Sequence, residues 1–68
     1  MALRWDDADE IGCQLCRKHG PALDPLSVRF TDLAKMVAAL EEFQDDPRAS
    51  TEGRLEAIQM AWLEHYQK

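Results

Sequence analysis

The chain has 68 residues, of which 46% are hydrophobic and 31% charged, and its formal net charge is -5 at pH 7. A chain of this length forms one domain, expected here over 1–68, and buries only about 60% of its unfolded surface. That leaves no room for a large enclosed pocket, so we do not expect an enzyme.

The excess of 13 acidic over 8 basic residues disfavours nucleic acid and anionic membranes as partners, because their phosphates would repel the protein. It favours a basic protein surface or a cation instead. No apolar run approaches the roughly 20 residues needed to cross a bilayer, and no targeting segment is recognisable. We therefore expect a cytoplasmic protein that is a monomer when free.

A first helix is predicted after the acidic N-terminal segment. Asp6 or Asp7 can cap it, and Asp7 with Glu10 has the spacing of a capping box. Gly20 followed by Pro21 ends it. Acids in its first turns and basic residues in its last turn suit the helix dipole, which accounts for part of the acidic cluster. Its apolar face, at helical spacing, consists of Trp5, Ala8, Ile11, Gly12, Leu15 and Cys16.

A second helix is predicted after a loop over residues 20–27. Residues 28–30 are β-prone, enough for at most a vestigial strand. Thr31 is a good N-cap for the second helix. Its apolar stripe closes on Phe43 and consists of Leu33, Met36, Val37, Leu40 and Phe43.

An acidic turn then leads to a third helix, which Ser50 or Thr51 can cap. Four carboxylates lie within residues 41–46, more than the one or two capping side chains such a turn needs, so we predict a negative surface there. Met60 and Leu63 lie off the apolar face of the third helix, which predicts a helix sandwiched in the core; the alternative is an exposed contact surface. That face consists of Leu55, Ile58, Ala61, Trp62 and Tyr66. The predicted fold is mainly α, a compact domain of three helices.

Cys13 and Cys16 are three positions apart on the first helix, and His19 follows them. Such thiols can share a metal ion or cycle through a disulfide. No second cysteine pair completes a tetrahedral site, and Cys16 lies on the apolar stripe, where a free cysteine behaves as a small hydrophobe. We interpret the pair as structural; the alternative is a thiol or metal-redox protein that uses it.

Two groups of acids carry oxygen ligands that suit ferrous iron, manganese, magnesium or calcium. Such open sites would bind weakly because no cage fixes the geometry. A solvated acidic face is the competing interpretation. The groups consist of Asp6, Asp9 and Glu10, and of Glu41, Glu42 and Asp45.

The chain as a whole resembles the IscX family, small acidic accessory proteins of bacterial iron–sulphur cluster assembly. The resemblance covers nearly the full length, and its most specific parts are VRFTD, DDPxAS and LEAI at their observed distances. The residues that carry it are Leu3, Arg4, Trp5, Asp7, Glu10, Ile11, Leu23, Asp24, Pro25, the run 27–32, Leu40, Phe43, Asp45, Asp46, Pro47, Ala49, Ser50, Glu52, the run 55–58, Trp62 and Leu63.

This resemblance implies a modified winged helix that binds the cysteine desulfurase IscS, on a basic surface that bacterial frataxin also uses. It further implies weak binding of ferrous iron through exposed carboxylates and a role as adaptor or regulator. By position, the implied partner-binding residues are Asp7, Glu10, Asp32, Glu41, Glu42, Asp45 and Asp46. The expected iron ligands are Asp7, Glu10, Asp45 and Asp46.

Four features depart from the family pattern, and one of them is a loop around residues 19–21 that is one residue longer. Met36 stands where the family has an aromatic residue, and the first helix ends with the basic residues Arg17 and Lys18. The cysteine pair is not part of the pattern. A winged-helix nucleic-acid binder remains the other alternative, but it needs a basic recognition helix, and no predicted helix is basic along its length.

Overall fold

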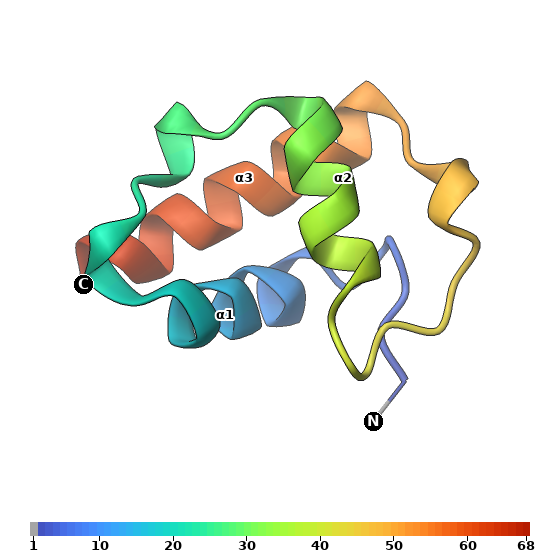
Figure 1. Cartoon of the computed structure of the whole chain (residues 1–68), viewed down its shortest axis with the longest axis horizontal. Helices are drawn as coiled ribbons and strands as arrows, with labels where there is room; N and C mark the ends of the chain where they lie inside the picture. The colour runs from blue at the N-terminus through green and yellow to red at the C-terminus, as the bar shows by residue number, and fades with distance from the viewer. Residues whose placement is uncertain (1) are drawn as a thin grey trace.

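The computed structural model describes residues 2–68, and in them three α-helices are joined by short 3-10 turns. Helices α1 and α3 lie side by side with their C-terminal ends near the C-terminus, and α2 crosses beside them (Figure 1). This arrangement confirms the predicted mainly α domain. The elements are α1 (Ala8–His19), η1 (Gly20–Ala22), η2 (Pro25–Ser27), α2 (Phe30–Ala38), η3 (Pro47–Ala49) and α3 (Glu52–Gln67).

The core draws apolar side chains from all three helices and from the N-terminal segment. Trp5 and Trp62 are its largest members and are almost completely buried. Truncating either side chain to alanine would lower the free energy of unfolding by about 3–5 kcal/mol. The buried hydrophobic residues are Leu3, Trp5, Ile11, Leu15, Leu33, Val37, Leu40, Leu55, Ile58 and Trp62.

Gly12 lets α1 approach α3 closely. A Cβ atom at this position would lie 2.6 Å from the backbone nitrogen of Trp62 and 2.8 Å from the carbonyl carbon of Ala61. No side chain fits at that distance without moving one of the two backbones. The glycine on the predicted apolar stripe therefore marks the tightest contact between the two helices.

The ends of α1 are set by glycine at one end and by a loop hydrogen bond at the other. Gly20 has a φ of 64°, which glycine adopts without strain, and its N–H donates to the carbonyl of Cys16. Asp7 is the N-cap, but its side chain does not cap the helix, so the predicted capping box is not formed. Its Oδ2 instead accepts a hydrogen bond from the Arg4 N–H at 2.9 Å.

Residues 28–29 are extended but pair with no other strand, and the part of the chain from 2 to 68 contains no β-strand. Helix α2 begins at Phe30 with Arg29 as N-cap, so the predicted cap at Thr31 is wrong. The reason is that the Leu33 N–H already bonds to the Arg29 carbonyl at 2.7 Å, which draws Phe30 and Thr31 into the first turn.

The apolar stripe of the second helix continues beyond the helix itself. Helix α2 ends at Ala38, and Phe43 forms an isolated parallel bridge with Leu3. The Leu3 N–H donates to the Glu42 carbonyl, and the Gln44 N–H donates to the Leu3 carbonyl, both at 2.8 Å. Phe43 thus continues the apolar spacing of α2 because it lies against the N-terminal segment, although the helix itself has already ended.

Helix α3 begins as predicted, since the Thr51 Oγ1 accepts from the Arg54 N–H at 3.2 Å. Met60 is 53% exposed, so the prediction of a helix sandwiched on all sides is wrong at this position. The two other helices cover α3 on one side only. Within residues 2–68, no helix combines the length and the apolar character that a membrane span requires.

Candidate functional site: an acidic edge

The N-terminal segment and the segment 41–46 run side by side because of the Leu3–Phe43 bridge. Two hydrogen bonds from Trp5 strengthen this pairing. Its backbone N–H donates to Asp45 Oδ2 at 3.1 Å, and its indole Nε1 donates to the Asp46 carbonyl at 2.7 Å. We call the surface formed here the acidic edge, and it comprises Asp7, Glu10, Glu41, Glu42, Asp45 and Asp46.

Asp45 holds the two segments together. Besides the Trp5 N–H, it accepts the Asp46 N–H through Oδ1 at 2.8 Å. The hydrogen bond from the Trp5 backbone, followed by that from Asp46, lowers the pKa of Asp45 below its usual value of 3.8. The positive charges of Arg4 and Arg54 lower the pKa further. Asp45 is therefore a structural carboxylate, each of whose oxygens accepts one backbone hydrogen bond.

Asp46 caps the next turn. Its Oδ1 accepts from the Arg48 N–H at 2.9 Å, and this bond opens η3 at Pro47. The same oxygen lies 3.7 Å from Arg48 Nε, an ion pair in which the arginine side chain is 92% exposed. Such pairs contribute little because water and salt screen them. Asp45 and Asp46 are thus the one or two capping side chains that a turn of this length is predicted to need.

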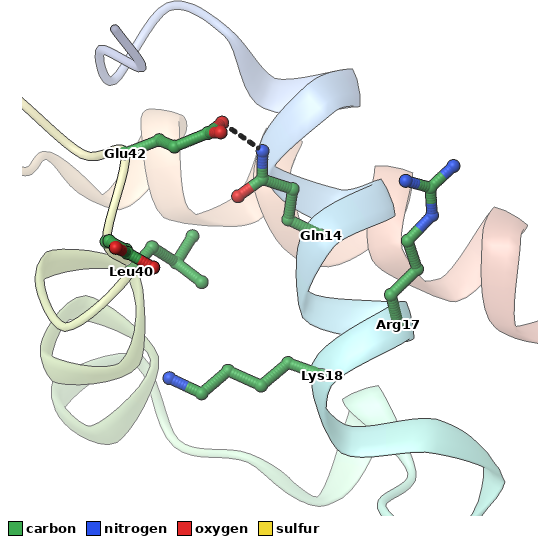
Figure 2. A pocket seen from close by; sticks show the side chains of 6 residues that line it. Gln14, Arg17, Lys18, Leu40 and Glu42 are labelled. Carbon is green, nitrogen blue, oxygen red and sulfur yellow. Dashed lines mark hydrogen bonds between the residues drawn. The ribbon is translucent and has the colours of Figure 1, made fainter. Parts of the chain in front are cut away.

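Glu42 and Gln14 connect the acidic edge to α1. Gln14 Nε2 donates to Glu42 Oε2 at 2.7 Å (Figure 2). Beside this contact is an open groove of about 420 Å³. In Figure 2, Lys18 extends from α1 toward the segment that carries Leu40. The groove is lined by Gln14, Arg17, Lys18, Leu40, Glu41 and Glu42.

Glu10 and Glu41 differ from the turn aspartates. Neither carboxylate has a hydrogen-bond or salt-bridge partner in the described chain, and Glu41 is exposed. Glu10 lies four residues before Gln14, which places both on one side of α1, the side that reaches Glu42. These two carboxylates are the members of the acidic edge that are free to meet a partner.

Asp32 does not belong to this edge. It lies in the first turn of α2, whereas the acidic segment 41–46 follows the other end of that helix. Nine helical residues separate the ends by about 13 Å. The structure therefore connects the four acids of residues 41–46 to the N-terminal segment that precedes Asp7 and to the side of α1 that carries Glu10, and it places Asp32 elsewhere.

Basic residues reduce the negative charge around the edge. Arg54 Nη2 lies 3.6 Å from Asp6 Oδ1, and Arg54 Nη1 donates to the Ala49 carbonyl. Arg17 and Lys18 face the groove next to the glutamates. The surface is a mixed one, with acids at its centre and cations at its borders. Sequence patterns did not reveal this groove, because its walls come from residues more than 20 positions apart.

The acids do not form a closed metal site. Among residues 2–68, no group of three or more His, Cys, Asp or Glu side chains lies close enough to hold a metal ion. Of the expected iron ligands, Asp7 and Asp45 accept backbone hydrogen bonds and Asp46 caps η3. Carboxylate oxygens suit hard cations in general, but in the described residues these acids are not gathered into such a group.

Fold and surface together define a small acidic helical domain whose charged face is open to solvent. Comparison with known proteins shows to which family within this class the chain belongs. The family model described as iron–sulphur cluster assembly matches residues 3–67, so the chain belongs to that family, the IscX family. It is also 50% identical over 64 residues to the uncharacterized protein PA3808 of Pseudomonas aeruginosa. This alignment covers 94% of the present chain and 96% of PA3808.

Proposed function

We propose that this protein is an accessory factor of iron–sulphur cluster assembly that binds the cysteine desulfurase IscS through the acidic edge. Membership of the family supports the process in which it acts. The observation that supports the mode of binding is the pair of unpartnered carboxylates, Glu10 and Glu41, on a protein whose formal net charge is -5. Such a surface attracts a basic partner and accelerates the encounter.

In this proposal the domain acts as an adaptor or regulator by occupying a basic surface on the desulfurase. Its role is then one of binding, with no catalytic step of its own. A protein that occupies this surface excludes any other acidic protein that needs it, so it competes with bacterial frataxin. A competition measurement with purified frataxin tests this directly: simultaneous, independent binding of both to the desulfurase would contradict it.

The main test uses charge reversal at the free carboxylates. Glu10→Lys with Glu41→Lys removes attraction without breaking a hydrogen bond, whereas reversal of Asp45 or Asp46 would also disturb the fold. We expect the association rate with the desulfurase to fall roughly tenfold at low salt and to lose part of its salt dependence. Stopped-flow or biolayer measurements at several ionic strengths provide both quantities.

The matched control is Glu56→Lys with Glu64→Lys, which makes the same charge change on exposed positions of α3. This variant should bind nearly as fast as the unmodified protein. An equal loss in both variants would show that net charge alone governs binding. Asp32→Lys, tested alone, shows whether the contact extends to the start of α2.

We also propose that the acidic edge binds ferrous iron weakly, through Asp7, Glu10, Asp45 and Asp46. The support is the chemistry of the carboxylate donors, and the open geometry explains why the affinity should be low. An anaerobic titration followed by paramagnetic broadening of amide signals would locate the ion. Broadening is expected around residues 7–10 and 45–46; broadening elsewhere or none at all would overturn the proposal.

A further inference from the structure

The two cysteines of α1 are not used by the acidic edge. Cys13 and Cys16 are both free thiols of intermediate exposure on the same helix. They are the two cysteines of the chain, and their spacing of three places them on neighbouring turns of one face. Cys16 packs against the hydrophobic core, so Cys13 is the outer member of the pair. The interpretation of the pair as purely structural leaves the accessibility of both thiols unexplained.

A metal site is not formed around this pair. No third His, Cys, Asp or Glu joins the two thiols in a metal-binding group within residues 2–68. His19, three positions after Cys16, lies with its ring centroid 6.0 Å from that of Trp62. The imidazole is therefore placed against the core aromatic. The chemistry left for these residues is that of two thiols acting on each other.

The helix geometry allows the thiols to close with a small distortion. Positions three apart in an ideal α-helix have Cα atoms about 5 Å apart, inside the range of about 4.4–6.8 Å found for disulfides. Their Cβ atoms are about 5–6 Å apart, whereas a disulfide needs about 3.5–4.5 Å. Closure must therefore bring the two Cβ atoms about 1 Å closer, which distorts this turn of α1 away from regular helical geometry.

We propose that Cys13 and Cys16 form a reversible redox site that closes to an intrahelical disulfide by exchange with a low-molecular-weight disulfide such as oxidised glutathione. The Cys13 thiolate attacks the glutathione disulfide, forms a mixed disulfide and releases one glutathione thiol. The Cys16 thiolate then attacks the Cys13 sulfur and releases the second glutathione. The two protein thiols are oxidised, and one small disulfide is reduced to two thiols.

The position of the site couples closure to the packing of α1. Gly12, which makes the tight contact with α3, directly precedes Cys13, and the fully buried Leu15 lies between the two cysteines. A distorted turn shifts both Gly12 and Leu15 from their places in the core. The oxidised form is therefore less stable than the reduced one, and its strained disulfide is easily reduced. This inference does not depend on the proposed partner.

The test uses the purified, fully reduced protein and mixtures of reduced and oxidised glutathione. Mass spectrometry and thiol titration should show a loss of two hydrogen atoms and a fall from two free thiols to none per chain, together with a lower melting temperature. Cys16→Ser should stop at the mixed disulfide on Cys13. The double variant Cys13→Ser with Cys16→Ser should not respond to the oxidant in either measurement.

A matched control moves one thiol to another face of α1. Cys13→Ser with Lys18→Cys keeps two cysteines but places them two positions apart, where their side chains do not face each other, and it leaves the Gln14–Glu42 hydrogen bond intact. This variant should accumulate mixed disulfides instead of closing. The proposal is overturned if the unmodified protein also accumulates stable mixed disulfides or a disulfide-linked dimer, or if its closed form melts at the same temperature as the reduced form.

Discussion

Asp45 and Glu41 belong to the same acidic segment but have opposite roles. Asp45 accepts two backbone hydrogen bonds and ties the segment to Trp5, while Glu41 is exposed and has no partner in the described chain. The first carboxylate stabilises the fold, and the second is free to contact another molecule. Counting acids in a sequence therefore overestimates the surface available for binding, because some of them serve as hydrogen-bond acceptors for the backbone.

The largest effect should come from truncating Trp5, the large buried side chain of the N-terminal segment that contacts the acidic segment. Trp5→Ala removes the core packing of a buried side chain and the hydrogen bond from its indole Nε1 to the Asp46 carbonyl. We expect a loss of about 3–5 kcal/mol in the free energy of unfolding. Urea denaturation provides the value. A loss below about 1 kcal/mol would mean that the acidic segment does not depend on the N-terminal segment.

A smaller effect is expected from Asp45→Ala, which leaves the N–H groups of Trp5 and Asp46 without their acceptor. Its melting temperature should fall by several degrees, and Asp45→Asn should fall in between, because the amide keeps one acceptor oxygen. Glu41→Ala is the matched control from the same segment. Equal melting temperatures for the two alanine variants would remove the distinction between the two acids.

The same comparison predicts a dependence on pH. The pKa of Asp45 in the folded protein is lower than its usual 3.8, so the folded state favours the ionised form. Its contribution to stability is complete above the unfolded pKa and is lost as the pH falls through the lower, folded value. The stability difference between the unmodified protein and Asp45→Ala should therefore shrink below about pH 4. A difference that stays constant down to pH 2 would contradict this.

The smallest effects on stability are expected at the free carboxylates. Glu10→Gln and Glu41→Gln each remove a charge that has no partner in the described chain, so each should change the free energy of unfolding by less than about 0.5 kcal/mol. Both should still slow association with a basic partner. Stability loss comparable to that of Asp45→Ala would show that these glutamates also hold the fold.

Local patterns determined much of this protein. Apolar residues at helical spacing predicted three helices, Gly20 predicted the end of α1, and Thr51 predicted the start of α3. These features depend on residues within one or two turns of each other, so a linear sequence contains them. The family followed from residues spread along nearly the whole chain, and the match over residues 3–67 confirms it.

Contacts between distant segments decided the rest. Phe43 has helical spacing, yet α2 ends at Ala38 because Leu3 pairs with residues 42–44. Asp45 is structural because the Trp5 N–H, 40 positions away, needs an acceptor. Met60 is exposed because the other helices cover only one side of α3. Periodicity reports that a residue is buried or exposed on average, but which partner satisfies each polar group is decided only when the chain folds back on itself.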